Sequence, residues 1–420
     1  MLGMETTLGS SGDWQIVETQ LPANWRDMAE RHGLDPAKVP AQLGAKVTDI
    51  LVPLRTVLYR VGTNCSLKTA VASAFASEMT DVSPVAVHLW ERKMGPFFAS
   101  LVAEMTGSER AFAADRWAGF GIVVVDASVV CRPGAQGTTA RVHFALRLTT
   151  LRPVHVEVTD DTGGESFRRF YPQAGELWMG DRAYANPPGV AFVKSSDAEV
   201  LVRYNRGGLP VYDIEGERLD VLAKLSRLRK PGQVREWAAW VHADGCEPIR
   251  GRLVAVRLPA DKAKQARERL RREQGSQVTA ESLTMASFVV VFTTVPKDKL
   301  SAERVLELYG LRWQIELHIK RDKSIAGLDR LPNQRPDTVY TWICAKLLLV
   351  QIAHKMASSH MAIPPRGLWS RLLDYSSTRP CRQTKDSEQE GSDRRRESRQ
   401  RALACDDPHL ADHLRGSLAY

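Results

Sequence analysis

Apolar residues in the first 115 positions recur at helical spacing, so we expect this region to be mostly helical. Residues 66–77 (SLKTAVASAFAS) open with a serine suited to an N-cap and continue in alanines, which favour a helix. After a turn at residues 81–84, a second helix follows (VAVHLWERKMGPFFASLVAEM), and we expect it to bend at Gly95 and Pro96.

These two helices and the polar turn between them allow two interpretations. They fit a helix-turn-helix, in which His88, Arg92 and Lys93 would address DNA. They fit an ordinary helical hairpin equally well, and the pattern leaves both open.

The next segment changes from helical to extended spacing. Residues 121–130 (GIVVVDASVV) form a continuous β-branched run, which is typical of a strand buried on both faces. Asp126 is its single charge, and a charged side chain in a buried strand is costly unless it is paired or binds a metal. Asp126 is therefore a candidate metal ligand.

Two further strand-like runs (RVHFALRLTT and VHVEVTD), a helical stretch (GESFRRFYP) and a short strand over residues 176–179 come next. Three consecutive strands, a helix and a further strand form the order of a ribonuclease-H-like core, an α/β fold. The short strand ends at Gly180 and Asp181, where an acid beside a glycine is well placed for an active site.

Residues 197–296 alternate strand-like runs with turns that contain Gly and Pro, so we expect a mainly β insertion with a basic surface. One highly charged helix, DKAKQARERLRREQG, interrupts the strands. Two basic clusters, Lys224 to Lys230 and Lys262 to Arg272, are either solvated faces or part of a DNA-binding surface.

The stretch from Tyr309 to Lys323 (YGLRWQIELHIKRDK) has apolar residues at helical spacing and no proline, which predicts one helix. At about 100° per residue, one sector of that helix carries Tyr309, Arg312, Glu316, Lys320 and Lys323. A carboxylate among cations suits a divalent metal bound against a phosphate backbone. The same pattern suits a solvated amphipathic helix with i,i+4 ion pairs.

The remaining sequence bounds the class of protein. One or two apolar helices are expected over residues 338–373, and the residues beyond 375 have few apolar side chains, so we expect disorder there. The six cysteines include no CxxC pair, which argues against a zinc ribbon and a disulfide framework. No signal peptide is evident and the apolar run over residues 345–353 is too short to span a membrane, so we expect a cytoplasmic protein. The net charge of +9 favours a polyanionic partner.

These segments predict five regions. They are a helical N-terminal DNA-binding domain over residues 1–115, the first part of the ribonuclease-H-like core over 116–196, the β-rich insertion over 197–296, the C-terminal helices of the core over 297–375, and a disordered basic tail over 376–420.

Three acids from three elements, Asp126, Asp181 and Glu316, offer the oxygen ligands that a two-metal phosphoryl-transfer site needs. One ion would lower the pKa of an attacking water or 3′-hydroxyl, and the other would stabilise the leaving oxygen. No histidine or cysteine cluster is expected to compete as a ligand set.

The spacing Tyr309–x2–Arg312–x3–Glu316–x6–Lys323 resembles the Y-R-E-K signature of DDE transposases from bacterial insertion sequences, specifically the insertion-sequence-4 family. The resemblance covers about residues 50–350. Only helical character relates the N-terminal region to that family, and the tail beyond residue 375 is unlike the compact helical end of such enzymes.

Two further motifs carry the resemblance. The VVVDAS strand with Asp126 and the GDRAY turn with Asp181 are similar to the family's first and second aspartate motifs, in the same order. The β-rich segment between Asp181 and Glu316 is similar to the family's insertion domain.

The resemblance implies a ribonuclease-H-like fold, two Mg²⁺ ions for which Mn²⁺ is expected to substitute, and cut-and-paste movement of an element bounded by inverted repeats. It implies a homodimer in the synaptic complex, with terminal repeats and target DNA as partners. Asp126, Asp181 and Glu316 would be the catalytic metal ligands. Residues that would hold DNA are Tyr309, Arg312, Lys320, Lys323 and Arg182.

In the family an aromatic residue, usually Trp, stacks on a flipped base, and Phe288 occupies the corresponding place here. Trp237 and Trp240 are rivals for that role, and core packing is an alternative for all three.

Two other functions remain open at this point. One is a catalytically inactive, transposase-derived DNA-binding protein. The other is a ribonuclease-H-like nuclease without strand transfer, which strand-transfer products would distinguish from a transposase.

Overall fold

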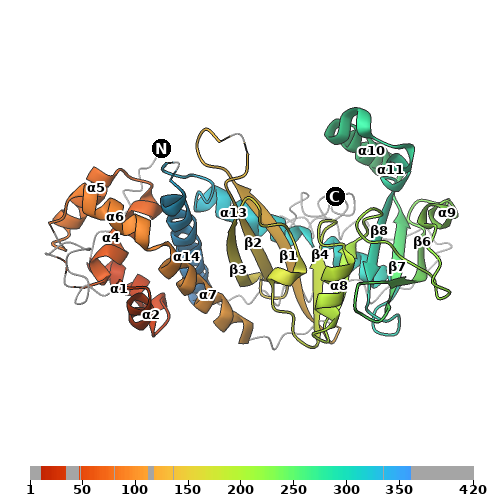
Figure 1. The fold of residues 1–420 in the computed structure, drawn as a ribbon, viewed down its shortest axis with the longest axis horizontal. Coiled ribbons are helices and arrows are strands. Elements are labelled where there is room, and N and C mark those ends of the chain that lie inside the picture. Colours follow the sequence, from red (N-terminus) through yellow and green to blue (C-terminus); the bar gives the residue numbers. More distant parts are fainter. Residues whose placement is uncertain are drawn as a thin grey trace, which may run out of the picture. The chain divides into compact units, whose positions relative to one another are not determined.

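The computed structural model describes residues 11–34, 47, 49–79, 81–111, 118–135, 137–333 and 335–360 (Figure 1). Contacts divide the described residues into two units. The first unit holds those of Met1–Pro210, Val241–Ile249 and Gln314–Ala362, and the second holds those of Val211–Trp240 and Arg250–Trp313. The predicted disordered tail lies outside the described residues.

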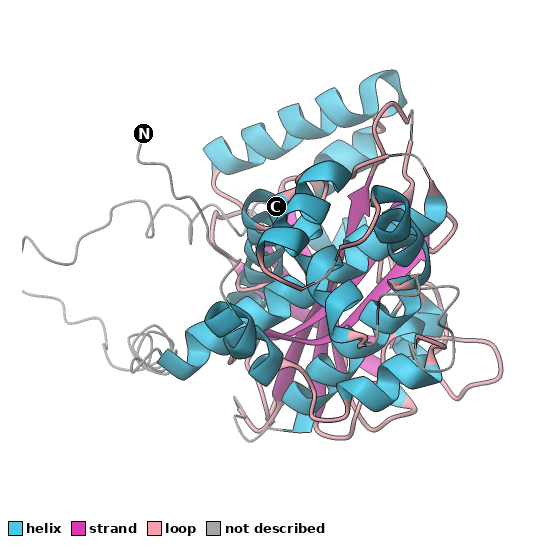
Figure 2. Ribbon diagram, turned by 90° about the vertical axis from the view of Figure 1, so that its left-hand side faces the viewer, coloured by secondary structure: helices cyan, strands magenta, loops and turns pink. Residues whose placement is uncertain are grey.

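The first unit begins with helices, as the sequence predicts. These are α1 (Ser11–Gln20), α2 (Trp25–Arg31), α4 (Leu51–Thr63), α5 (Leu67–Ala76), α6 (Pro84–Lys93) and α7 (Gly95–Ala111). The predicted N-cap forms, because the Ser66 hydroxyl accepts the Thr69 backbone N–H at 3.1 Å. In Figure 2 the molecule is turned so that these helices face the viewer, with strands behind them.

The predicted bend at Gly95 and Pro96 is a complete break, with Met94 between α6 and α7. A proline cannot continue the hydrogen-bond ladder of the preceding helix. A β-carbon on Gly95 would lie 2.6 Å from the Tyr340 ring, so the absence of a side chain lets the C-terminal helix approach here.

The sheet of the first unit has the strand order β3-β2-β1-β4-β5. Its strands are β1 (Gly121–Val130), β2 (Ala140–Arg147), β3 (Arg152–Asp160), β4 (Glu176–Gly180) and β5 (Glu199–Arg203). The first three form an antiparallel meander, and β4 and β5 run parallel to β1. This order confirms the α/β fold with a ribonuclease-H-like core.

The connections of this sheet differ from the prediction in one place. The stretch GESFRRFYP forms only a single 3₁₀ turn, η1 (Phe167–Arg169), rather than a longer helix. Phe167 and Phe170 are fully buried on both sides of that turn, so apolar anchoring holds the segment in place of helical hydrogen bonds. The regular crossover is α8 (Pro187–Lys194), which connects β4 to β5.

The prediction of one continuous helix from Tyr309 to Lys323 is wrong, because the structure has two helices there. Helix α12 (Ala302–Gly310) ends before Leu311, and α13 (Trp313–Ile325) begins two residues later. The Leu311 and Arg312 N–H groups donate to carbonyls three residues back, at 2.9 and 3.0 Å, which tightens the last turn and ends the helix. The single sector inferred for the whole stretch therefore does not exist as one helical face.

The chain then forms α14 (Pro336–His360), one long helix where one or two were expected. It packs against α7, α6 and α4 of the same unit. The second apolar segment expected near residue 370 lies outside the described residues. No helix in the described ranges is long and apolar enough to cross a membrane.

The second unit is largely the segment predicted as a β-rich insertion. Its strand order is β8-β7-β6, with β6 (Val234–Val241), β7 (Ile249–Arg257) and β8 (Phe288–Thr293). The helical segments are α9 (Val221–Leu225), the predicted charged helix α10 (Ala260–Gln274), the 3₁₀ turn η2 (Gly275–Gln277), α11 (Ala280–Met285) and α12. The strand-like runs predicted over residues 197–296 form these three strands and β5 of the first unit.

Candidate active site

Strand register brings the two predicted aspartates to the same level. In the parallel pair β1–β4, Gly121 is opposite Glu176 and Val124 is opposite Met179. If this pairing is extended by two residues, Asp126 lies opposite Asp181. Asp181 directly follows Gly180, the last residue of β4. Adjacent strands lie about 4.8 Å apart, so the two acids project from neighbouring positions at one edge of the core.

Antiparallel pairing shows which face of the sheet carries Asp126. Asp126 is directly opposite Phe144 of β2, and directly paired residues project from the same face. The Phe144 ring meets the His318 ring of α13 edge-on, with ring centroids 5.9 Å apart. Helix α13 therefore packs against the face from which Asp126 projects.

Glu316 lies on the side of α13 that reaches β1. The Lys323 ammonium donates a hydrogen bond to the backbone carbonyl of Val129 at 3.0 Å. Glu316 precedes Lys323 by seven residues, which is close to two helical turns, so both project from the same side of α13. Glu316 therefore shares a side of α13 with Lys323, the residue that contacts β1.

Backbone hydrogen bonds fix the two aspartates. The Asp126 carboxylate accepts the N–H of Ala127 at 2.8 Å, and the Asp181 carboxylate accepts the N–H of Ala183 at 2.8 Å. Both side chains are half-buried, as is that of Glu316. Partial burial strengthens electrostatic interactions while leaving access for a substrate.

The pKa of a buried tyrosine depends on several of these acids at once. Tyr184 is fully buried, and its hydroxyl oxygen has no hydrogen-bond partner among the described residues. Burial raises the pKa of Tyr184, and the carboxylates of Asp126, Glu165 and Asp181 raise it further. One phenol thus lies within electrostatic range of three carboxylates.

Glu165 is an acid that the sequence interpretation missed. It is half-buried, and burial followed by the charge of Asp181 raises its pKa, while Arg141 acts in the opposite direction. The signal was present in the sequence as the acid of GESFRRFYP, but the expected helix gave no reason to aim it at the site. Like charges crowded in this way, with oxygen as the donor atom, fit a divalent cation.

The predicted DNA-binding residues fall into two groups. In the first unit, Arg182 and Lys320 are exposed and Lys323 is half-buried. In the second unit, Tyr309 and Arg312 are buried, with exposed fractions of 4% and 8%. Their side chains do not form the exposed edge that the sequence interpretation describes.

Phe288 is also buried in the second unit, at 3% exposure, and the Arg257 guanidinium lies over its ring at 5.5 Å. This geometry favours the core-packing alternative for Phe288. Its rivals Trp237 and Trp240 are half-buried on β6.

The three residues of the possible helix-turn-helix also differ in their contacts and exposure. Arg92 donates a hydrogen bond to the Asp337 carboxylate at 2.7 Å, which links α6 to α14. Lys93 is exposed and His88 is half-buried. DNA recognition by α5 and α6 stays a prediction.

The expectation that no histidine cluster offers a ligand set is wrong. One ligand atom each from His318, Asp322 and His354 lie within 4.8 Å of one another. Helix α14 supplies His354 from a position far along the chain, so the packing of α13 on α14, rather than local spacing, brings the cluster together.

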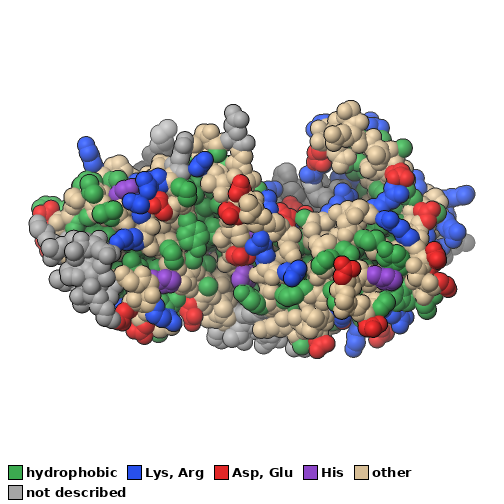
Figure 3. Space-filling model, in the orientation of Figure 1, with side chains coloured by type: hydrophobic (Ala, Val, Ile, Leu, Met, Phe, Trp, Pro, Cys, Tyr) green, Lys and Arg blue, Asp and Glu red, His purple; other side chains and the backbone are tan. Residues whose placement is uncertain are grey.

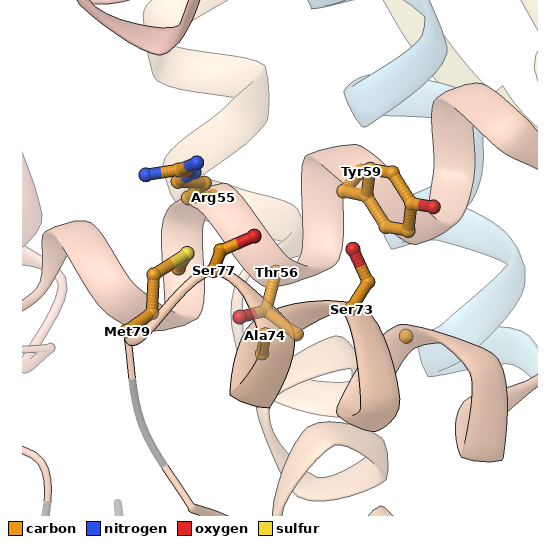
Figure 4. Close-up of a pocket in the computed structure, with 8 residues that line it drawn as sticks. Arg55, Thr56, Tyr59, Ser73, Ala74, Ser77 and Met79 are labelled. Atoms are coloured by element: carbon orange, nitrogen blue, oxygen red, sulfur yellow. The ribbon is translucent and has the colours of Figure 1, made fainter. Parts of the chain in front are cut away.

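A shallow pocket between α4 and α5 (Figure 4) contains no acid, histidine or cysteine, and its lining residues are Arg55, Thr56, Tyr59, Ala70, Ser73, Ala74, Ser77 and Met79. On the face in Figure 3, basic side chains are interspersed with acidic ones.

Comparison with known proteins identifies the family. Residues 117–352 match the family described as "Transposase DDE domain". The chain is 31% identical to the transposase for insertion sequence element IS421 of Escherichia coli over 77% of this chain and 90% of that protein. It is also 31% identical to the putative transposase InsL for insertion sequence element IS186A of E. coli strain K12, over 73% of this chain and 84% of that protein.

A solved structure, the piggyBac transposase synaptic complex with hairpin DNA, aligns with a TM-score of 0.39 and 8% identity. The alignment covers 96% of this chain and 82% of that one. The family match spans both aspartate motifs and the helix with Glu316, and the chain belongs to the DDE transposases.

Proposed function

We propose that this transposase cleaves DNA strands at the ends of its own mobile element and joins the freed 3′-hydroxyl to target DNA, with Asp126, Asp181 and Glu316 as the catalytic acids. The observation that carries the proposal is the register of β1 and β4, which sets Asp126 level with Asp181 on the face covered by α13. Three carboxylates from three elements supply oxygen ligands of the kind that phosphoryl transfer requires.

Asp126, Asp181 and Glu316 would hold two divalent ions, Mg²⁺ or Mn²⁺. When bound, such ions activate a water or 3′-hydroxyl and stabilise the leaving oxygen. The chain contributes fixed carboxylates, since the Ala127 and Ala183 N–H groups hold Asp126 and Asp181 in place. Positioning of this kind needs no covalent enzyme–DNA intermediate.

Exposed cations beside the acids would hold the DNA backbone. Arg182 follows Asp181 directly, and Lys320 is one turn beyond Glu316 on α13. Both are exposed and can contact phosphates, which makes binding dependent on salt concentration. We further propose a homodimer at the paired element ends, terminal inverted repeats and target DNA as partners, and a cytoplasmic location with the bacterial nucleoid.

The test uses the full chain and linear DNA that carries the native element ends. The wild type should nick the ends in Mg²⁺ or Mn²⁺ and, with target DNA present, give strand-transfer products. Asp181→Asn should reduce nicking at least about 100-fold, as when one electrostatic group is removed from a preorganised site, while end binding stays intact. The matched control is Asp161→Asn, an exposed aspartate, which should cleave like the wild type.

Three outcomes would contradict parts of the proposal. Wild-type cleavage by Asp181→Asn would remove that residue from the site. Nicking without strand-transfer products would favour the nuclease alternative. Specific end binding without any cleavage by the wild type would favour the inactive DNA-binding protein.

A further inference from the structure

A second group of potential ligands lies on the side of α13 opposite Glu316. His318 and Asp322 are four residues apart on α13, so their side chains project from one face of that helix. His354 of α14 completes the group, with the His318 and His354 rings 5.3 Å apart between centroids. The three potential ligand atoms lie within 4.8 Å of one another.

Burial makes this arrangement costly without a further partner. His318 and Asp322 are only 5% and 3% exposed. The His318 Nε2 and Asp322 Oδ2 atoms face each other at 3.5 Å, and neither forms a hydrogen bond within the described part of the chain. A buried polar atom without a partner costs roughly 1–3 kcal/mol, so two such atoms that converge on one point call for an explanation.

We propose that His318, Asp322 and His354 form a binding site for one divalent transition-metal ion of the zinc class, separate from the catalytic acids. A ligand set of two imidazoles and one carboxylate suits Zn²⁺, Fe²⁺ or Co²⁺ and leaves room for water or another ligand. An ion there would bind both of the unsatisfied atoms at once.

Neighbouring charges select the class of ion. Arg321 directly precedes the ligand Asp322, and both Arg321 and Arg152 interact electrostatically with His354. Cations bound mainly by charge, such as Mg²⁺ and Ca²⁺, gain little beside two arginines and prefer oxygen ligands. Imidazole nitrogen binds zinc-class ions by coordination, so these ions tolerate such surroundings better.

The site would fix the position of the helix that carries Glu316. His318 and Asp322 hold α13, His354 holds α14, and the Phe144 ring against His318 connects the site to the strand opposite Asp126. A bound ion would therefore join α13 to α14 on the side of α13 that contacts Phe144. Its role is structural, because none of its three ligands is among the proposed catalytic acids.

The experiment measures metal binding directly on the full chain. Protein stripped with a chelator is titrated with Zn²⁺ against a chromophoric competitor, its retained metal is counted by mass spectrometry, and Co²⁺ binding is followed by its visible spectrum. The expected result is one tightly bound ion per chain, a d–d spectrum of a nitrogen–oxygen site, and a higher Tm with Zn²⁺ than in chelator.

Variants assign that ion to the cluster. His354→Gln and Asp322→Asn keep side-chain size and should weaken Zn²⁺ binding by at least about tenfold and abolish the rise in Tm. The control His155→Gln changes another half-buried histidine of the same unit and should bind like the wild type. Asp126→Asn should also retain the ion, because it alters only the catalytic acids.

Comparison of Tm values in chelator separates loss of folding from loss of the site. His354→Gln, the variant at the most exposed of the three ligands, should match the metal-free wild type there. Absence of bound Zn²⁺ and Co²⁺ in the wild type would overturn the proposal, as would equal binding by wild type, His354→Gln and Asp322→Asn. Loss of the ion in Asp126→Asn with retention in His354→Gln would assign it to the catalytic acids instead.

Discussion

Strands and helices hold the three proposed catalytic acids in different ways. Asp126 and Asp181 are aligned by the ladder of β1 and β4, in which each residue has one partner. Glu316 lies on α13, which begins only three residues before it, after a break that the sequence pattern conceals. The hydrogen-bonded register of a sheet fixes neighbouring residues, whereas a helix is placed by whatever its sides contact.

The largest expected effect tests the helical side of this comparison. Glu316→Gln keeps the size of the side chain but removes its charge, so strand cleavage should fall at least about 100-fold while folding is retained. Nicking of end DNA in Mg²⁺ provides the measurement. Glu307→Gln, at an exposed acid of α12, is the control and should cleave normally. Equal activity of the two variants would mean that α13 does not deliver an acid to the strands.

A second change tests the strand side. A β-carbon on Gly180 would lie 2.8 Å from the Tyr184 β-carbon, so Gly180→Ala should displace the turn that carries Asp181. Overpacking of this kind costs about 1–3 kcal/mol of the free energy of unfolding. Denaturant unfolding and nicking should both show the loss. Gly207→Ala meets its nearest atom only at 3.8 Å and should stay within about 0.5 kcal/mol of the wild type.

The contact between helix and strand gives a smaller effect. Lys323→Met removes the hydrogen bond to the Val129 carbonyl and one positive charge. If Lys323 also holds a phosphate, the slope of log affinity against log salt should fall by about 0.9. Filter binding over a salt series measures this slope, and thermal unfolding reports the lost contact. A lower Tm with an unchanged salt slope would mean that Lys323 connects α13 to β1 but does not contact a phosphate.

The smallest expected effect concerns α14, which carries none of the three proposed catalytic acids and so serves as a reference. Burial acts to raise the pKa of Asp337, but hydrogen bonds from Arg92 and Arg335 outweigh it and hold the pKa well below its ordinary 3.8. The resulting stabilisation exists above pH 3.8 and is lost as the pH falls toward the lower folded-state pKa. Asp337→Asn should therefore cost about 1 kcal/mol at pH 7, since Arg92 is partly exposed, and much less at pH 2. An equal cost at both values, in denaturant unfolding, would rule out the charge as its source.

The sequence predicted the strands better than the helices that surround them. A continuous β-branched run predicted the bounds of β1, and strand-like runs separated by turns with Gly and Pro predicted the strands of the second unit. Helical spacing could not reveal the break at Leu311 and Arg312, because i→i+3 hydrogen bonds do not disturb the apolar pattern. The same difference explains why the sequence alone could place Asp126 in a strand and Asp181 at the end of another strand.

Long-range packing was beyond the reach of the sequence. Asp322 follows His318 by one turn, and on a single helix that spacing suggests an exposed polar stripe. Burial of both comes from contact with Phe144 and with α14, which no local pattern encodes. Glu165 was missed because it precedes a single 3₁₀ turn and not the helix that was expected. The buried side chains of Phe167 and Phe170 hold this segment in place.

The parallel pairing of β1 with β4 also determines which parts of the chain can fold first during synthesis. A parallel pair needs a crossover, and here the whole meander of β2 and β3 has to be made before β4 can pair with β1. Glu316 comes later still, after the described residues of the second unit have been synthesised. During synthesis the N-terminal helices can therefore fold first, while the acids are still apart. A nascent chain released before residue 316 would lack one of the three proposed catalytic acids.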